Sequence, residues 1–303
     1  MLKKKYTDGE LMRLLEIDKK TLERFQAIRK DTIRQARKLV KRPGKIKVLG
    51  ISGSARSEFG FAQENSNSEE LLKRCLAHFE KLGAKTELVP LREYSIKPCN
   101  ACYSTTNTQC HFYCSCYPKG TPEGDDMSNI LYDKVLAADA IVFATPVNNF
   151  KMSTMMGAFI DRCISLDGSL APVNPKSPKD KNLNIKHMKF IELTADNDIP
   201  GSGMLRRFSG KVAGVIVTGH EEGASMVIST LFMTLSHFGM LFPPFANMYA
   251  MASVCNSTYK DKEMVLGDCY ASDLKSLAFN VHLAVKIAKK YPATAWKTDY
   301  RSN

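Results

Sequence analysis

Five of the nine cysteines in this 303-residue chain fall within eighteen consecutive residues. Thiolates bind soft metal ions, and two neighbouring thiols can also cycle between a dithiol and a disulfide. Clustered cysteines in a reducing compartment are more typical of metal binding or catalysis than of structural disulfides. The sequence therefore predicts a chemically active loop over residues 99–116, whose candidate metal ligands are Cys99, Cys102, Cys110, Cys114 and Cys116.

The spacing of these cysteines leaves four interpretations open. An iron–sulfur cluster needs four thiolates from a short loop, and a structural zinc ion needs four ligands, here Cys99, Cys102 and two of the later three. The two residues between Cys99 and Cys102 are also typical of a redox-active disulfide. The fourth interpretation is a loop that binds no metal. For a bound metal, we expect Cys99, Cys102 and Cys110 as ligands, with Cys114 or Cys116 as the fourth.

A second group of chemically useful residues follows the apolar segment 45–52. A strand that runs directly into a helix presents backbone N–H groups and the positive end of the helix dipole, where a phosphate binds. Serine and asparagine donors surround this turn, and Gly53 permits close backbone approach. The sequence has neither a GxGxxG nor a GxxxxGK[ST] motif. The alternative is an ordinary polar turn in which Asn67 or Ser68 caps the helix.

The segments that position these residues alternate between strand and helix patterns. Near-continuous apolar runs, which are typical of strands buried on both faces, alternate with amphipathic segments typical of helices. The expected strands are 45–52, 84–91, 140–147, 211–219 and 240–251, the last of them broken by prolines. This alternation predicts an α/β fold with a doubly wound parallel sheet and helices on both faces.

Two segments lie outside this alternation. Residues 1–44 have apolar side chains at helical spacing, and Pro43 and Gly44 end that pattern. Residues 168–210 are long for a connection and predict a lid, an oligomer contact or a disordered loop; the stretch HMKFIEL within them is a candidate extra strand. We predict a basic helical arm over 1–44 and a domain over 45–303 that carries the loop 99–116 and the insertion 168–210.

The positive charge of the chain is concentrated in the arm. The formal net charge is +12, and residues 1–47 contain sixteen Lys and Arg against six Asp and Glu. A basic terminal arm can touch phosphates or anionic lipid, but the rest of the chain has no basic stripe interleaved with aromatic residues, so we do not expect nucleic acid to be the main partner. No apolar run is long enough to span a bilayer, and we expect a soluble cytoplasmic protein.

Several motifs together resemble one known family. Along the chain stand KVLGISGSAR, NSNSEELL, IKPCNAC, ADAIVFATPVNNFKMSTMMGAFIDR and GVIVTGHEEGA. In this order they resemble the NADPH-dependent FMN reductase-like family of flavodoxin-fold proteins, including its iron–sulfur flavoprotein branch, over about residues 45–290. The resemblance implies a flavodoxin-like five-stranded parallel sheet in the order 2-1-3-4-5, with three loops that bind FMN converging at the carboxyl ends of the strands.

The resemblance also implies which residues bind FMN. The first loop would hold the phosphate, the turn after the third strand would lie along the isoalloxazine ring, and the loop after the fourth strand would complete the site. Asn148 stands where the family often has an aromatic residue, and the insertion 57–64 lengthens the first loop beside Arg56. His220 contacts the flavin or the nicotinamide, or is a satisfied structural histidine. The implied ligands are Ser52, Ser54, Arg56, Asn67, Ser68, Thr145, Pro146, Val147, Asn148, Asn149, Thr218, Gly219 and His220.

By this resemblance we expect an NAD(P)H-dependent FMN oxidoreductase. It would pass electrons from NAD(P)H or a reduced carrier to a small acceptor such as a flavin or quinone, with an iron–sulfur cluster as a further carrier if the loop 99–116 holds one. Two alternatives are a non-enzymatic iron–sulfur flavoprotein that transfers electrons to a protein partner, and a regulatory or binding protein that uses its basic arm. No catalytic acid or base is identified. The resemblance also implies a homodimer or homotetramer.

Overall fold

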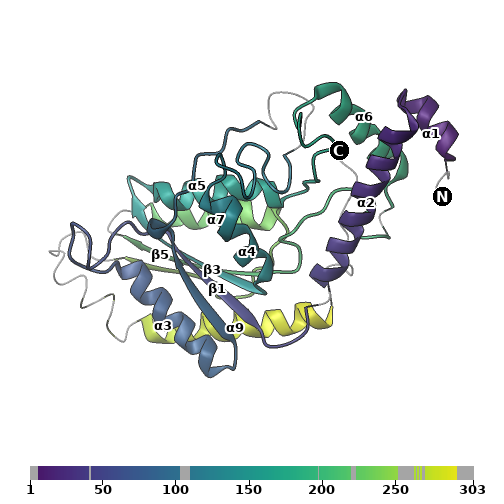
Figure 1. The fold of residues 1–303 in the computed structure, drawn as a ribbon. Helices are drawn as coiled ribbons and strands as arrows, with labels where there is room; N and C mark the ends of the chain where they lie inside the picture. The colour runs from purple at the N-terminus through teal and green to yellow at the C-terminus, as the bar shows by residue number, and fades with distance from the viewer. Residues whose placement is uncertain are drawn as a thin grey trace.

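A twisted sheet between two layers of helices forms the body of the protein, and a further group of helices lies at one end (Figure 1). The computed structural model describes residues 6–40, 42–102, 110–196, 198–219, 223–251, 263, 265, 267 and 270–291. Within these ranges, no helix is both long enough and apolar enough to cross a membrane.

Five parallel strands form the sheet in the order β2-β1-β3-β5-β6. In chain order they read 2-1-3-4-5, so the predicted fold class and strand order are confirmed. A two-residue strand, β4 (Lys151–Met152), pairs antiparallel with the end of β3. The parallel strands are β1 (Lys47–Ser52), β2 (Lys85–Pro90), β3 (Ala140–Asn148), β5 (Val212–Gly219) and β6 (Asn247–Met251).

Helices cover both faces of this sheet. The helices α3 (Asn67–Lys81) and α9 (Ala271–Lys290) pack on one face. The helices α4 (Tyr132–Ala137), α5 (Thr154–Arg162) and α7 (Ala224–His237) pack on the other face. Short helical turns at Leu91–Glu93, Met127–Leu131 and Cys163–Leu166 join some of these elements.

The central strand β3 shows why its sequence is continuously apolar. Successive side chains of a strand point to opposite faces, and Val142 joins the core beneath α3 and α9 while Phe143 joins the core beneath α4, α5 and α7. Both side chains are fully buried. A strand with helices on both faces has no solvent-facing side, which accounts for the absence of polar alternation.

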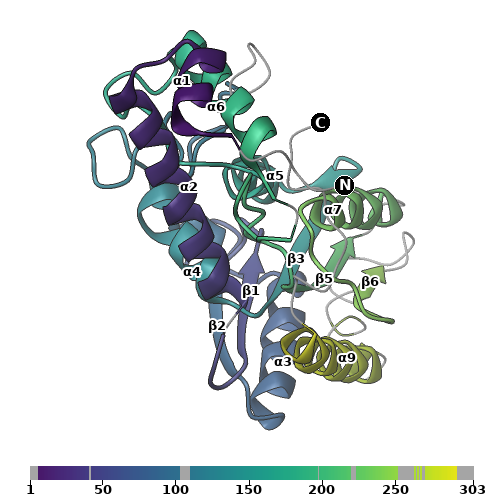
Figure 2. The same ribbon diagram turned by 90° about the vertical axis from the view of Figure 1, so that its right-hand side faces the viewer.

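The helices α1 (Asp8–Leu15) and α2 (Lys19–Val40) form a third core together with α6 (Lys181–Thr194). Figures 1 and 2 show these three helices side by side, away from β6. Phe25 of α2 lies 4.6 Å from the ring of His187 and 5.4 Å from the ring of Phe190, measured between ring centroids. The first helices of the chain therefore bury their apolar side chains on a helix of the segment 168–210.

The expected extra strand at HMKFIEL is wrong, because this stretch lies inside α6. Its buried side chains are His187, Phe190 and Ile191. A spacing of three and four residues places them on one face of a helix, towards α2, whereas a strand would place His187 and Phe190 on opposite faces. The predicted division at residues 44 and 45 falls between the end of α2 and the start of β1.

Candidate functional site

The three predicted FMN loops follow strands that are neighbours in the sheet. Ser52 at the end of β1 is in register with Ala144 of β3, and Pro146 of β3 is in register with Thr218 of β5. All three strands therefore end at the same edge. Because the chain leaves β1 towards β2 and leaves β3 towards β5, the loops flank the topological switch point, where open α/β sheets bind their ligands.

The first loop begins with a tight contact between two backbones. Gly53 donates its N–H to the carbonyl of Ala144 (2.8 Å), and its own carbonyl accepts a hydrogen bond from the Ser153 hydroxyl (2.5 Å). A Cβ on Gly53 would stand 2.8 Å from the Cβ of Met156 and 2.9 Å from Ser153 Oγ. Only glycine fits here, and it fixes the first loop against the start of α5.

The N-terminus of α3 lies at the end of this loop and keeps its first-turn N–H groups free of a side-chain cap. Ser66 is the N-cap residue but makes no capping hydrogen bond. Its hydroxyl instead pairs with the hydroxyl of Ser68 at 2.8 Å. Uncapped N–H groups at the positive end of a helix dipole form an anion site. This geometry is the arrangement that a phosphate-binding loop requires.

A buried ion pair supports the same helix end from below. The Ser52 hydroxyl donates to Glu69 Oε2 (2.8 Å), and Glu69 also pairs with the guanidinium of Arg92. Burial alone would raise the pKa of Glu69, but the hydrogen bonds from Arg92 and Ser52 outweigh it and hold the pKa below its usual value. Ser52 therefore has a structural partner already, which the sequence did not indicate.

The second loop is a two-residue β-hairpin. Asn148 of β3 pairs with Lys151 of β4, and the two residues between them, Asn149 and Phe150, both have positive φ angles of 50° and 63°. Two left-handed residues in succession are the mark of a type I′ turn, which matches the twist of the flanking strands. Phe150 is 58% exposed. An aromatic side chain thus stands at the tip of the hairpin, two residues after the position where the family often has one.

Thr145 lies beneath this hairpin and faces the protein interior. It is fully buried, and its hydroxyl donates to the carbonyl of Pro146 (3.0 Å) and accepts the N–H of Ser153 (3.2 Å). The third loop abuts the same hairpin, since a Cβ on Gly219 would stand 2.9 Å from the Cβ of Val147. His220 lies outside the described residues.

The predicted FMN ligands therefore separate into two groups by exposure. Arg56, Asn148 and Asn149 are exposed, and Asn67, Pro146 and Gly219 are half-buried. The other described candidates are buried, and several have hydrogen-bond partners of their own, including Ser54, whose hydroxyl accepts the N–H of Arg56 at 3.1 Å. Buried candidates that are ligands would act through their backbone groups rather than through their side chains. The buried candidates are Ser52, Ser54, Ser68, Thr145, Val147 and Thr218.

The five clustered cysteines lie close together in the structure. The Cys116 thiol donates to the sulfur of Cys102 at 3.5 Å. The charges of Cys114, Cys102 and Cys99 each contribute to raising the pKa of Cys110. Cys110 and Cys114 are buried, whereas the other three are half-buried. The structure thus brings together all five sulfurs that the sequence identified.

The environment of these thiols favours thiolates at two positions. A hydrogen bond from Cys116 lowers the pKa of Cys102 to about 5, to which Lys179 contributes, and a hydrogen bond from Cys116 lowers the pKa of Cys114 to about 6. The pKa of Cys116 is raised in turn, because its thiol donates to both neighbours. Burial raises the pKa of Cys110 to about 12. Lys179 comes from the insertion 168–210, which the sequence did not connect with the cysteines.

A buried ion pair holds the cysteine loop against α5. Arg162 at the end of α5 pairs with Asp125, and both side chains are 1% exposed. Arg162 also donates to the carbonyl of Lys97 (3.0 Å) and lies 4.4 Å from the ring of Tyr117. No sequence signal connected Asp125 with Arg162, because a pair separated by 37 residues has no local pattern.

The part of the cysteine loop that the structure describes shows no preformed metal site. Among the residues that the structure describes, no group of three or more His, Cys, Asp or Glu side chains has the geometry to hold a metal ion. The thiols do receive backbone N–H donors, including a 3.4 Å contact from Ala101 to Cys99, and such donors stabilise thiolate charge with or without a metal.

Comparison with known proteins agrees with this geometry. The sequence model of the family described as NADPH-dependent FMN reductase matches residues 46–181. An iron–sulfur flavoprotein of Archaeoglobus fulgidus is 32% identical over 120 residues, which are 39% of this chain and 51% of that protein. An iron–sulfur flavoprotein of Methanosarcina thermophila is 29% identical over 121 residues, which are 40% of this chain and 54% of that protein. The chain therefore spans about half the length of the curated relatives it matches, and the predicted resemblance to this family is confirmed over residues 46–181.

A solved structure agrees with the fold over a larger part of the chain. The crystal structure of RosB with a bound intermediate, 8-demethyl-8-formylriboflavin-5'-phosphate, superposes with a TM-score of 0.55 at 17% identity and covers 82% of each chain. At this identity the likeness concerns the fold alone. Because it covers 82% of this chain, the likeness extends well beyond residues 46–181.

Proposed function

Since residues 46–181 match the NADPH-dependent FMN reductase family, we propose that this protein is an FMN-dependent oxidoreductase that takes electrons from NAD(P)H and passes them to a small acceptor. The observation that carries the proposal is the convergence of three loops beside the uncapped N-terminus of α3. Bound FMN would supply the hydride and electron chemistry. The protein itself binds and orients the cofactor.

The first loop is the proposed phosphate site. Gly53 lets the backbone approach the ligand closely, and the free N–H groups of the first turn of α3 point out of the helix end. Asn67 is half-buried and adds an amide donor, and Arg56 is exposed and adds a positive charge. Charge-assisted hydrogen bonds from such groups are about twice as strong as neutral ones.

The hairpin after β3 is the proposed wall for the isoalloxazine ring. Accessible surface along this turn comes from Pro146, Asn148 and Asn149. The family often has an aromatic residue at the position of Asn148, and here the exposed ring of Phe150 would take that role. Aromatic side chains stack on planar ligands at ring-centroid distances of about 4.5–7 Å. The interpretation of His220 as a contact of the flavin or nicotinamide stays a prediction.

The test of this function is direct. The full chain, purified and reconstituted with FMN, should bind one FMN per chain and oxidise NADPH or NADH in the presence of an added flavin or quinone. Comparing the two nicotinamides identifies the donor, and comparing acceptors identifies the acceptor class. A chain that binds no FMN under these conditions contradicts the proposal.

The second candidate function is an electron carrier with an iron–sulfur cluster in the loop 99–116. The five gathered thiols and the similarity to two iron–sulfur flavoproteins favour it. The lack of a group of metal-holding geometry in the described part of the chain opposes it. Anaerobic purification followed by iron, sulfide and zinc analysis separates the two views. About four iron and four sulfide per chain would establish the cluster. Zinc without iron would indicate a zinc site instead, and the absence of both metals would indicate a site of free thiols.

We also propose that the protein forms a homodimer or homotetramer through the edge of the sheet at β6. This strand is the last in the sheet, and Figure 2 shows it between α7 and α9. Large apolar side chains are exposed on each of these three elements, and exposed apolar surface is typical of interfaces. Light scattering of the wild type and of a Phe279→Lys variant tests this surface. The exposed side chains are Met226, Phe232, Met233, Tyr249, Phe279, Leu283 and Ile287.

A further inference from the structure

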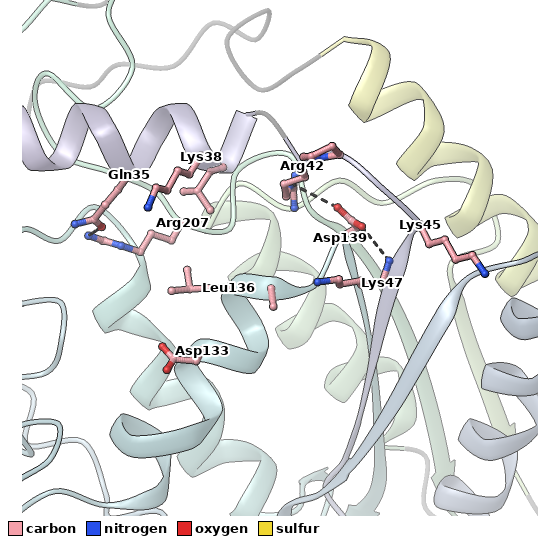
Figure 3. Close-up of a pocket in the computed structure, with 12 residues that line it drawn as sticks. Gln35, Lys38, Arg42, Lys45, Lys47, Asp133, Leu136, Asp139 and Arg207 are labelled. Atoms are coloured by element: carbon pink, nitrogen blue, oxygen red, sulfur yellow. Dashed lines mark hydrogen bonds and ion pairs between the residues drawn. The ribbon is translucent and has the colours of Figure 1, made fainter.

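A cavity of about 480 Å³ lies at the amino edge of the sheet, opposite the edge that carries the flavin loops. Its walls come from the end of α2, from the segment that leads into β1, from α4 and from Arg207 (Figure 3). Leu39, Pro43 and Leu136 form an apolar part of the wall. This volume is within the range of sites for small organic ligands, which is about 300–1,000 Å³.

Five cations and two carboxylates line the same cavity, which gives it a surplus of positive charge. The cations are Lys38, Arg42, Lys45, Lys47 and Arg207, and the carboxylates are Asp133 and Asp139. Figure 3 shows Lys38 next to Gln35 and Arg207 on one side, with Arg42 and Asp139 together on the other. The surplus raises the question of which of these charges already have partners.

Two cations at this edge are held by backbone carbonyls. Lys211 is fully buried beside the cavity, and its amine donates to the carbonyls of Leu136 (2.9 Å) and Ala138. Arg42 donates to the carbonyls of Ala138 (3.1 Å) and Gly210 (3.0 Å). The last carbonyls of a helix are free and carry the negative end of its dipole, and α4 ends at this place. Neither cation therefore needs a ligand.

The two carboxylates of the wall also have partners. Asp133 pairs with Lys119 and accepts a hydrogen bond from the hydroxyl of Tyr113 at 2.7 Å. Asp139 lies 3.6 Å from Arg42 Nε and 3.2 Å from Lys289 Nζ. Both negative charges are therefore engaged, and neither balances the other cations of the wall.

Arg207 is buried in the wall and forms no ion pair with any described residue, although the charge of Asp31 acts on it and its guanidinium lies 4.1 Å from the centre of the Phe112 ring. It is 2% exposed, and its Nη1 and Nη2 atoms donate to neutral oxygens, including those of Ser169 (3.0 Å) and Gln35 (3.1 Å). Its Nε is buried without a hydrogen-bond partner in the described part of the chain. Burial lowers the pKa of Arg207 to about 9. A buried guanidinium without an ion pair is costly, and an anion bound beside it would lower that cost.

Two lysines complete the unbalanced group. Lys38 and Lys47 are exposed at the mouth of the cavity, and neither forms an ion pair with any residue that the structure describes. A guanidinium presents a planar fork of donors that matches phosphate oxygens, and ammonium groups add point charges. Together with the apolar wall, these three cations are suited to a ligand that carries both a phosphate and a carbon body.

We propose that this cavity binds a phosphate monoester of small-molecule size, with its phosphate near Arg207 and Lys38, where Lys47 adds positive charge from the opposite wall, and its carbon body against Leu39, Pro43 and Leu136. The site is separate from the FMN phosphate loop, because it lies at the opposite ends of the strands. It is independent of the proposed function, and its failure would leave that function intact.

The test uses the full chain saturated with FMN and two soluble probes, phenyl phosphate and inorganic phosphate, measured by calorimetry. We expect one phenyl phosphate per chain, bound more tightly than inorganic phosphate because the ring gains the apolar wall. A double variant, Lys38→Ala with Lys47→Ala, should weaken binding by about tenfold or more through the loss of two positive charges from the wall. The matched control is Lys85→Ala, an exposed lysine on β2 in register with Lys47, which should leave binding unchanged.

Phosphate monoesters also occur as lipid headgroups, so co-sedimentation with vesicles of phosphatidylcholine and phosphatidic acid forms a second arm. Binding to these vesicles that depends on Lys38 and Lys47 identifies a headgroup, and binding to phenyl phosphate identifies a soluble metabolite. Both results support phosphate recognition. The proposal is overturned if the wild type binds neither probe nor vesicle at about 10 mM total phosphate, or if Lys85→Ala weakens binding as much as the double variant. The lysine variants change exposed residues and do not depend on Arg207 for folding.

Discussion

Buried cationic side chains have different kinds of partner at the two edges of the sheet. Towards the carboxyl edge, Arg162 pairs with the buried carboxylate of Asp125. At the amino edge, Lys211 donates only to backbone carbonyls and Arg207 only to neutral oxygens, although Arg42 and Lys289 flank the buried carboxylate of Asp139 there. Helix N-termini gather at the carboxyl ends of parallel strands, and helix C-termini gather at the amino ends. The backbone therefore supplies partners for cations at one edge and for anions at the other.

This difference teaches where side-chain charge is needed. At the carboxyl edge, backbone N–H groups can bind an anion without a buried cation, as the uncapped end of α3 shows. At the amino edge, the backbone presents carbonyls, which bind cations. An anion there therefore needs more cationic side chains than the carbonyls already bind. The surplus of cations around the cavity at α2 is of that kind.

The largest effect is expected from breaking the carboxylate pair. Asp125→Asn leaves Arg162 buried and without its charged partner, and we expect a loss of about 3–5 kcal/mol in the free energy of unfolding. Glu87→Gln breaks the exposed pair with Lys134 and should cost less than about 1 kcal/mol. Denaturant unfolding of both variants measures the contrast. A loss of similar size in both would contradict the role of burial.

The same pair predicts a dependence on pH. Burial would raise the pKa of Asp125, but its hydrogen bonds, above all from Arg162, hold the pKa below the usual 3.8. The stabilisation is therefore complete above that value and is lost as the pH falls through the lower folded-state pKa. The difference between wild type and Asp125→Asn should shrink in that acid range.

A smaller effect is expected where two backbones meet at the first loop. Gly53→Ala places a Cβ 2.8 Å from the Cβ of Met156, and such overpacking costs about 1–3 kcal/mol. It should also displace the loop and weaken FMN binding, which quenching of flavin fluorescence measures. The control is Gly157→Ala on α5, where an added Cβ meets nothing within 4 Å and a gain of up to about 1 kcal/mol is expected. Unchanged FMN affinity in Gly53→Ala would contradict the assignment of this loop.

At the amino edge, the burial of Lys211 predicts a rise of stability with pH. Burial lowers the pKa of Lys211 well below 10.5, so between the two values the unfolded chain binds more protons than the folded one. Stability therefore increases with pH in this window. The free energy of unfolding of the wild type should therefore rise relative to that of Lys211→Met from about pH 7 to about pH 10. Lys85→Met, an exposed control, should show no such growth.

The sequence predicted the carboxyl edge far better than the amino edge. The apolar runs and the turns that follow them are local features, so the five strands, their order and the loops after Ser52, Asn148 and Gly219 could be placed. The partners of individual side chains could not, because pairs such as Arg162 with Asp125 join segments far apart in the chain. At the candidate ligand Ser52, the hydroxyl faces Glu69 instead of a ligand.

The packing of the insertion 168–210 is a second feature that could not be predicted from local sequence. Its prolines and lysines indicated a loop, but the side chains of α6 are helical partners of α2 and could be recognised only once both helices were seen together. The cavity at the amino edge depends on this packing as well, since α2 forms one of its walls and Arg207 follows α6 in the chain. The five cysteines were found from the sequence because they are close in sequence as well as in space.

The smallest effect is expected at the tip of the hairpin, where stability and ligand binding should change in opposite directions. Phe150 adopts a φ of 63°, a left-handed conformation that costs a non-glycine residue about 1–2 kcal/mol. Phe150→Gly removes this strain but gives the unfolded chain more freedom, so we expect a net gain of only about 0.5 kcal/mol. If Phe150 covers the flavin ring, FMN affinity should fall by several-fold in the same variant, whereas Phe59→Gly in the exposed first loop should leave it unchanged. Equal affinity in Phe150→Gly and wild type would show that the exposed ring at the hairpin tip serves another contact.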